Sequence, residues 1–277
     1  MKKILVSLAV VLCSAAMVSA QDLETVTTTY NNAAAAIAEN KTEAIKLFEE
    51  ALSGAEALGE DGAAIVDQCK EILPKLYVSV AKEAVAAKDF TTAISKFKVA
   101  EDIAEQYGDE EAKAEVAEIM PKIFIQLGAS QLKEGNMDAA IETFEEALEL
   151  GQTDVASKQL SNIYVKKAAA AQKAKDLKGA MEMAQRSIEY LDNATAQKLL
   201  GLSALSLKQN KVAADALKAY LALSPEAKDK VQIMYQLGTA LVAAGENGEA
   251  CGYFKQIAQD AKWGEAARYQ ITTLKCN

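Results

Sequence analysis

The stretch EILPKLY at residues 71–77 returns as EIMPKIF at residues 118–124, a shift of 47 positions. Each copy holds a proline, Pro74 or Pro121, within a sequence that otherwise favours helix. Self-similarity at a fixed spacing is typical of a repeat architecture. It predicts a chain built from consecutive copies of one helical unit rather than a globule around a single core.

A second helical pattern follows each copy, with small and aromatic residues spaced by four and then three positions. The two triplets are Ala93, Phe97 and Ala100, then Ala140, Phe144 and Ala147. Residues three and four apart share one face of a helix, so each triplet forms a single seam. Its small residues let a neighbouring helix approach closely, and its aromatic ring fills the space beside them. Each unit is therefore predicted to be a helical hairpin.

These residues resemble the signature of the tetratricopeptide repeat family. The fullest copy consists of Phe124, Leu127 and Gly128 on a first helix, a turn at Gly135 and Asn136, and Ala140, Phe144 and Ala147 on a second helix. Gln131 stands where the family usually has tyrosine, which makes that contact more polar. The resemblance implies an all-α fold: a right-handed superhelix of about six helical hairpins, with first helices on the concave face and a capping helix at residues 264–275.

Further copies follow the same spacing with lower fidelity. They are marked by Ala44, Phe48 and Ala51; by Ala180, Ala184 and Ser187; by Gly201, Ala213, Leu217 and Pro225; and by Gly238, Gly245, Ala250 and Phe254. The early copies lie 49 and 47 residues apart, against about 34 in the standard repeat. We assign the extra residues to extended first helices. Because proline removes one helical hydrogen bond, each is expected either to kink near Pro74 and Pro121 or to break into two short helices.

The first twenty residues have the layout of a secretory signal peptide, in which Lys2 and Lys3 precede an apolar run and small residues end the segment at Ala20. That run is too short to span a bilayer, which takes about 20 apolar residues, and no later segment is expected to do so. Cys13 follows Leu12, where a lipoprotein signal would have a small residue. We expect an exported protein, in the periplasm of a Gram-negative bacterium rather than fully secreted, with residues 21–277 as one repeat domain.

Composition argues against several classes of function. Without Lys2 and Lys3, 28 basic residues stand against 39 acidic ones, and a net charge of −11 disfavours nucleic acid as a partner. The chain has no histidine, so it cannot form a histidine-based catalytic triad or a zinc site with imidazole ligands. Its sequence has no phosphate-binding loop and no calcium loop. We expect no enzyme activity, no cofactor and no metal.

Lysine gathers on the expected first helices, whereas the expected second helices carry most of the acids. The first-helix windows contain Glu83 and Glu134 against Lys75, Lys82, Lys88, Lys122, Lys133, Lys166, Lys167, Lys173, Lys175, Lys198 and Lys208. This division predicts a basic groove that attracts a protein or peptide of acidic character. Its leading contacts are Lys75, Lys82, Lys122, Lys133, Lys166, Lys173 and Tyr235. The alternative is that the lysines solvate the helices and pair with nearby acids, while Tyr235 packs between repeats.

Three cysteines follow the signal segment: Cys69, Cys251 and Cys276. If the last helices form a hairpin that turns near residues 260–263, Cys251 and Cys276 fall at the same end, as the short reach of a disulfide requires. We predict that these two are bonded and that Cys69 is a buried thiol. Trp263, the only tryptophan, is expected to cover the end of the core.

These expectations combine into a non-catalytic protein–protein interaction scaffold of the cell envelope, which binds a protein or peptide along the concave face of the repeats. The alternative is a structural component that self-associates through exposed repeat ends into an envelope assembly. The sequence leaves the oligomeric state open.

Overall fold

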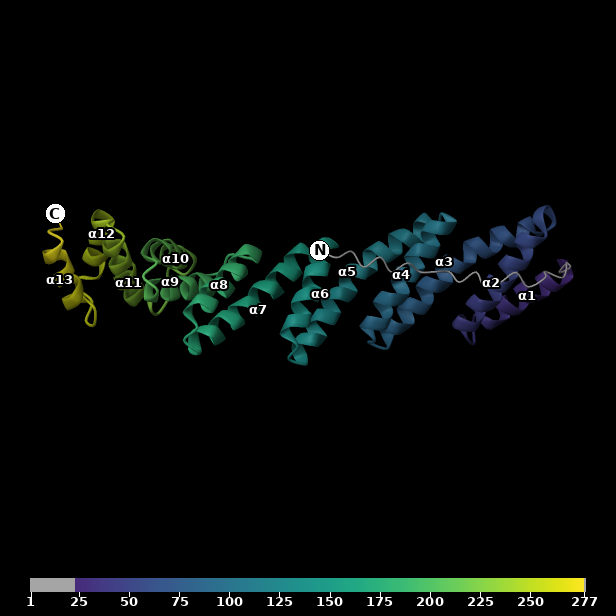
Figure 1. Cartoon of the computed structure of the whole chain (residues 1–277), viewed down its shortest axis with the longest axis horizontal. Coiled ribbons are helices and arrows are strands. Elements are labelled where there is room, and N and C mark those ends of the chain that lie inside the picture. The colour runs from purple at the N-terminus through teal and green to yellow at the C-terminus, as the bar shows by residue number, and fades with distance from the viewer. Residues whose placement is uncertain (1–22, 277) are drawn as a thin grey trace. The chain divides into compact units, whose positions relative to one another are not determined.

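A computed structural model describes residues 23–276, and the predicted signal peptide, including Cys13, lies outside this range. Regular structure within it consists of thirteen α-helices and one 3-10 turn, and these residues include no strand (Figure 1). The elements are α1 (Leu23–Ala36), α2 (Lys41–Ala57), η1 (Gly59–Gly62), α3 (Ala63–Ala86), α4 (Phe90–Tyr107), α5 (Glu110–Lys133), α6 (Met137–Glu149), α7 (Thr153–Lys173), α8 (Leu177–Tyr190), α9 (Ala194–Ser206), α10 (Asn210–Leu223), α11 (Lys230–Ala243), α12 (Asn247–Ile257) and α13 (Gly264–Thr273). The all-α prediction is confirmed.

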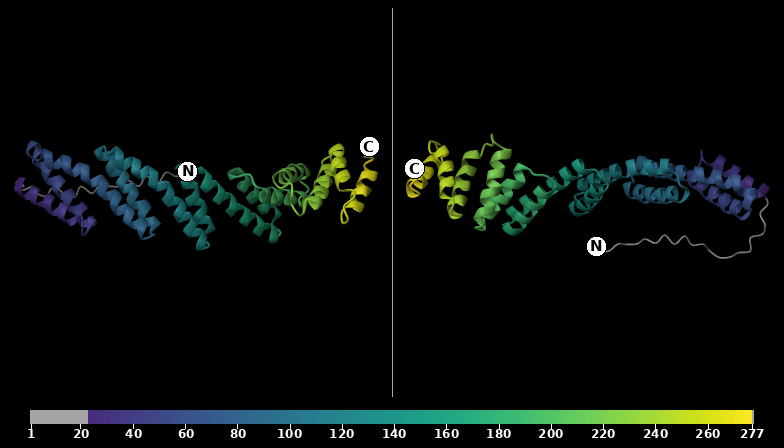
Figure 2. Two further views of the ribbon diagram at one scale, coloured as in Figure 1. Left: turned by 180° about the vertical axis from the view of Figure 1, so that it is seen from behind. Right: turned by 90° about the horizontal axis from the view of Figure 1, so that it is seen from above.

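The helices pack in consecutive pairs, as the repeat pattern predicts. Contacts join α1 to α2, α3 to α4, α7 to α8, α9 to α10 and α11 to α12, while Gly128 of α5 faces Phe144 of α6. Contacts between hairpins join α2 to α3, α6 to α7, α8 to α9 and α10 to α11, and the purple end of the chain in Figure 2 shows α2 beside α3. With α13 packed on α12, the described residues contain the six hairpins and the terminal helix that the sequence predicts. The chain divides into two compact units, and the boundary falls within α5 between Ile123 and Phe124.

The seams of alanine and phenylalanine form the core of the hairpins. Phe48, Phe97, Phe144 and Phe254 are fully buried. A side chain at Gly128 would place its Cβ only 2.8 Å from the ring of Phe144, well inside van der Waals contact. The glycine is therefore required by the close approach of α5 to the aromatic ring of α6.

The two proline-containing first helices are continuous. Both α3 and α5 run for 24 residues with Pro74 and Pro121 inside them, so the prediction of extended first helices is confirmed and the alternative of two short helices is wrong. Leu73 and Leu76, on either side of Pro74, are both buried. This apolar packing holds the helix together across the hydrogen bond that proline removes.

The fourth hairpin has alanine at the usual aromatic position and contains a buried polar cluster. Ala184 occupies the aromatic position and is fully buried, as is Ser187 one turn later. The hydroxyl oxygens of Ser161 on α7 and Ser187 on α8 lie 2.8 Å apart, and the Asn193 side chain donates a hydrogen bond of 2.8 Å to Ser161. Buried hydroxyls need such partners because an unpaired polar group in the core is destabilising.

Three lysines occupy turn positions that elsewhere hold glycine. Lys88, Lys175 and Lys208 have φ of 59°, 63° and 60°, in the left-handed region, and Gly135 and Gly245 have φ of 87° and 86° in the corresponding turns. The sequence pattern predicts these lysines on the first helices. That prediction is wrong, because each lies two residues beyond the end of its helix. At that point the positive charge faces the negative end of the helix dipole.

None of the helices in the described range is long and apolar enough to cross a bilayer.

Candidate partner-binding surfaces

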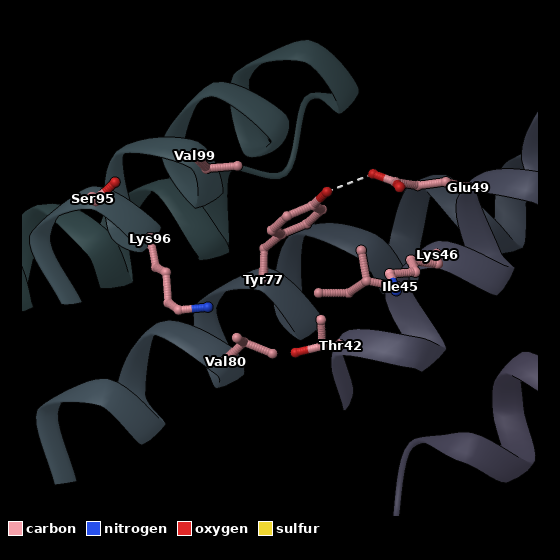
Figure 3. Close-up of a pocket in the computed structure, with 9 residues that line it drawn as sticks. All are labelled: Thr42, Ile45, Lys46, Glu49, Tyr77, Val80, Ser95, Lys96 and Val99. Atoms are coloured by element: carbon pink, nitrogen blue, oxygen red, sulfur yellow. Dashed lines mark hydrogen bonds between the residues drawn. The ribbon is translucent and has the colours of Figure 1, made fainter. Parts of the chain in front are cut away.

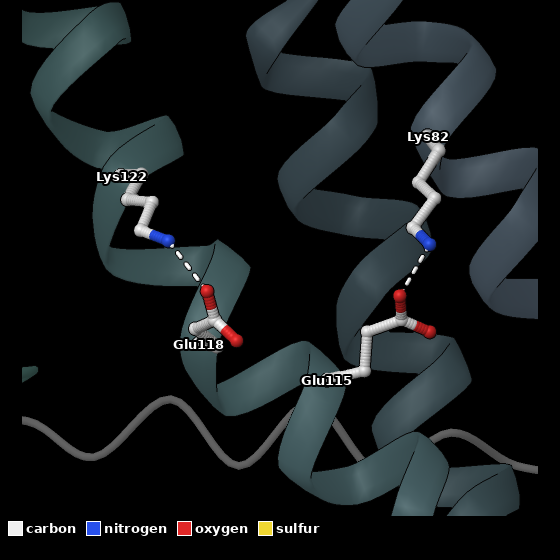
Figure 4. A network of polar contacts seen from close by, with 4 residues as sticks. All are labelled: Lys82, Glu115, Glu118 and Lys122. Atoms are coloured by element: carbon white, nitrogen blue, oxygen red, sulfur yellow. Dashed lines mark hydrogen bonds and ion pairs between the residues drawn. The ribbon is translucent and has the colours of Figure 1, made fainter.

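Three of the predicted groove lysines lie beside carboxylates. Lys82 of α3 forms an ion pair with Glu115 of α5, and Lys122 pairs with Glu118 one turn away at 2.8 Å (Figure 4). Lys75 lies 3.5 Å from Glu71, also one turn away. The hydrogen bond from Lys122 holds the pKa of Glu118 below its ordinary value. An anionic partner would have to compete with these carboxylates, although exposed pairs of this kind are individually weak.

The predicted separation of charge fails on α3 and α5. The windows read from the sequence left out the early turns of both helices, and these turns carry acids: Asp67, Glu71, Glu110, Glu111, Glu115 and Glu118. Lys75 itself lines a shallow hollow with Lys70, and four carboxylates surround that hollow, those of Asp67, Glu71, Asp109 and Glu110. This part of the surface is therefore not basic.

The remaining predicted lysines form a different arrangement in the second unit. Lys133 ends α5, and Lys166 and Lys173 lie seven residues apart on α7, which places them on one face of that helix. Lys133 and Lys173 also occupy equivalent places, because each comes two residues before the left-handed turn residue, Gly135 or Lys175. All three are exposed, and none forms an ion pair with any residue in the described range. We call Lys133, Lys166 and Lys173 the lysine patch.

Two other first-helix lysines of the second unit are held by carboxylates. Lys167 binds Asp138 at 2.6 Å, and Lys198 pairs with Asp229, which also accepts a hydrogen bond of 2.6 Å from the Tyr220 hydroxyl. Burial raises the pKa of Asp229, but the hydrogen bonds from Lys198 and Tyr220 outweigh it and hold that pKa below its ordinary value. Burial and the bond to Asp229 raise the pKa of Tyr220 to about 12.

Tyr235 is largely engaged in packing. Its ring centroid lies 5.7 Å from that of Phe254 and 5.0 Å from that of Trp263, within the range of favourable aromatic contacts. Trp263 packs against the C-terminal core cluster, as predicted for a residue that covers its end. One edge of Tyr235 still borders an open hollow with Lys262, Glu265 and Tyr269, and Tyr269 is 69% exposed.

The cysteines lie where the hairpin argument puts them. Cys251 on α12 and Cys276 beyond α13 are joined as a disulfide with a Cα–Cα separation of 5.6 Å. Cys69 is a free, buried thiol on α3, and burial raises its pKa to about 11. Such a thiol is protonated and unreactive at neutral pH. Within the described range, no group of three or more acidic or cysteine side chains is arranged to hold a metal ion.

A pocket between α2, α3 and α4 was not predicted from the sequence. Its volume is about 320 Å³, and Figure 3 shows its lining of Thr42, Ile45, Lys46, Glu49, Tyr77, Val80, Ser95, Lys96 and Val99. The Tyr77 hydroxyl donates a hydrogen bond to Glu49 across one side of it. Burial, followed by this bond, raises the pKa of Tyr77 well above its ordinary value, so the residue remains a neutral donor. The sequence shows only scattered polar residues around Ile45 and Val99. Helical periodicity does not indicate that residues of separate helices lie together.

Comparison with known proteins finds no matching family model and no matching curated protein. Solved structures with some likeness include a MamA protein, at 18% identity over 74% of this chain and 96% of that one, with a TM-score of 0.32. Another is YrrB, described as a TPR protein with an unusual peptide-binding site, at 14% identity over 70% and 91%, with a TM-score of 0.34. A third is TTC0263, described as a thermophilic TPR protein of Thermus thermophilus, at 19% identity over 73% and 98%, with a TM-score of 0.28.

The fold assignment rests on the hairpins themselves. In the third and sixth hairpins a glycine of the first helix faces a buried phenylalanine of the second, Gly128 against Phe144 and Gly238 against Phe254. In the fifth hairpin Gly201 faces Leu217 in the same way. Because one packing unit recurs along the described chain, this protein has the fold of a tetratricopeptide-type helical repeat.

Proposed function

We propose that this chain is a non-catalytic protein–protein interaction scaffold, and that it holds an acidic protein or peptide along the first helices of its second unit. The observation that carries the proposal is the lysine patch. Lys133, Lys166 and Lys173 are exposed and lack carboxylate partners, whereas most other lysines of the first helices have them. In a chain with a net charge of −9, three exposed lysines that form no ion pair with a carboxylate in the described range are an unusual feature.

The charge on the neighbouring second helix supports the same orientation. Four glutamates of α6 line one shallow surface, Glu142, Glu145, Glu146 and Glu149. An acidic partner is repelled by that surface and attracted to the lysine patch, so the charges orient the encounter as well as accelerate it. The attraction weakens with salt, because the lysines are exposed and screening acts over about 8 Å at physiological ionic strength.

The export part of the proposal rests on residues 1–20 of the sequence. The layout of a signal peptide there supports a place in the cell envelope, and in the periplasm if the source is a Gram-negative bacterium. Amino-terminal sequencing of the protein from an envelope fraction tests this. A chain that begins at Gln21 supports export, and an intact Met1 in the cytoplasmic fraction contradicts it.

Chemical crosslinking in intact cells tests the binding proposal. The test variant carries Lys133→Glu, Lys166→Glu and Lys173→Glu, and the control variant carries Lys178→Glu, Lys211→Glu and Lys228→Glu at exposed positions away from the first helices. The proposal expects one partner to be captured by the wild type and the control and to be lost from the test variant. Equal capture by both variants would rule out the lysine patch as the binding surface.

A further inference from the structure

The pocket between α2, α3 and α4 lies in the first unit and includes none of the lysine patch. It combines an apolar wall of Ile45, Val80 and Val99 with charged groups at its rim. At about 320 Å³ it is at the small end of the range of ligand sites, roughly 300 to 1,000 Å³. A pocket of this size accommodates one or two side chains of a partner rather than a large cofactor.

The lysines at the rim determine the charge of the group that the pocket attracts. Lys96 points into the pocket from α4 and forms no ion pair with any residue in the described range (Figure 3). Lys46 enters from α2, and its only carboxylate partner there, Glu43, lies 3.5 Å away at the exposed surface. Glu49 is the one acid of the lining, and it already accepts the hydrogen bond from Tyr77. The lining therefore has a surplus of positive charge within an acidic protein.

Comparison of the repeats shows that hairpin packing does not require the Tyr77 hydroxyl, Lys96 or Val99. Moving 47 positions along the chain, the seam residues Ala93, Phe97 and Ala100 return unchanged as Ala140, Phe144 and Ala147. The pocket residues do not return: Tyr77 becomes Phe124, Lys96 becomes Thr143 and Val99 becomes Glu146. Because a neighbouring hairpin folds without the tyrosine hydroxyl, the lysine or the valine, their combination here serves something other than the hairpin.

We propose that this pocket binds a short segment of another polypeptide in which an aliphatic side chain is followed by a carboxylate side chain. The aliphatic group packs on Ile45, Val80 and Val99, and the carboxylate pairs with Lys96. Tyr77 and Glu49 form a polar edge, where the second oxygen of Glu49 accepts a hydrogen bond from a backbone N–H of the segment. The inference rests on the proposed function as a polypeptide-binding scaffold, but it names a separate site with its own residues.

Methyl NMR of the full chain tests the pocket directly. With labelled isoleucine and valine methyl groups, the probe is the peptide acetyl-Ala-Leu-Glu-Ala-amide. We expect saturable shifts at the methyl groups of Ile45, Val80 and Val99. Replacement of the peptide's glutamate by glutamine, or Lys96→Met in the protein, should weaken binding by about threefold to fivefold, the effect of an exposed charge pair. Replacement of its leucine by serine should abolish the shifts.

Lys98→Met is the matched control, since Lys98 is exposed on the same helix and does not line the pocket. It should bind the probe as the wild type does, and Lys96→Arg should retain most of the affinity. Absence of saturable shifts, equal shifts with the serine peptide, or unchanged affinity in Lys96→Met would each overturn the proposal. The variant Lys133→Glu, Lys166→Glu, Lys173→Glu should still bind the probe, so failure of the lysine patch and failure of the pocket give different results.

Discussion

The close approach of helices within a hairpin predicts that Gly238→Ala destabilises the protein. In an exposed helix this change is stabilising by about 1 kcal/mol, because alanine favours helix over glycine. At Gly238 the added Cβ would lie 2.7 Å from two ring carbons of Phe254, which is fully buried and cannot move aside freely. Overpacking of this kind costs about 1–3 kcal/mol. The clash outweighs the gain in helix propensity, so we expect a net loss of about 1 kcal/mol.

The same hairpin supplies the control. Gly252 lies on α12, is exposed, and has no atom within 4 Å of the position that a Cβ would occupy. Gly252→Ala should therefore stabilise the protein by about 0.5–1 kcal/mol. Urea unfolding measures both changes. In the background of Phe254→Ala, where the ring is gone, Gly238→Ala should become neutral or stabilising. Equal stabilisation by Gly238→Ala and Gly252→Ala in the wild-type background would refute the packing argument.

Three further predictions concern the cysteines, the turns and a buried tyrosine. Mass spectrometry of the unreduced protein should show Cys251 linked to Cys276 and one free thiol, whereas free thiols at both positions would contradict the bond. The double variant Cys251→Ser, Cys276→Ser should lower the free energy of unfolding by about 3 kcal/mol. Glycine tolerates positive φ, so stability should rise by about 0.5–1 kcal/mol, and the urea midpoint with it, in each of Lys88→Gly, Lys175→Gly and Lys208→Gly. Lys178→Gly, within α8, should lower both. Because folding raises the pKa of Tyr220 to about 12, its contribution to stability should be complete below its ordinary value near 10 and be lost as pH rises through 12. Ultraviolet titration should show that the tyrosine absorbance change near pH 12 is smaller by one residue in Tyr220→Phe, and an unchanged amplitude there would disprove the assignment.

The features that could be predicted from the sequence are those that depend on local spacing. The seams around Phe97 and Phe144 are set by residues three and four apart on one helix, so a periodic pattern identifies them without coordinates. The pairing of Cys251 with Cys276 follows from a single hairpin. The final helix was expected at residues 264–275 and runs over Gly264–Thr273. Its apolar residues face the core formed by α11 and α12.

The features that escaped prediction depend on how separate helices face one another. Lys82 and Glu115 are 33 residues apart, and their ion pair depends on the rotation of α3 relative to α5, which residue spacing does not specify. The pocket joins residues of three helices in the same way. Lys88 was placed on a first helix by its position in the sequence, whereas it lies in the following turn with a φ of 59°, which lysine rarely adopts. The sequence therefore named the three lysines of the lysine patch, but it did not show which lysines pair with acids, and it did not identify the residues of the pocket.

A nuclear Overhauser measurement between the two helices of one hairpin tests the central structural claim most directly. If α5 lies against the ring of Phe144, the Hα protons of Gly128 should show strong cross-peaks to the aromatic protons of Phe144, together with large ring-current shifts. Gly238 should show the same toward Phe254, and exposed Gly252 should show neither. Ordinary random-coil shifts at Gly128 and Gly238, without cross-peaks to the two rings, would contradict the hairpin packing on which both proposed binding surfaces depend.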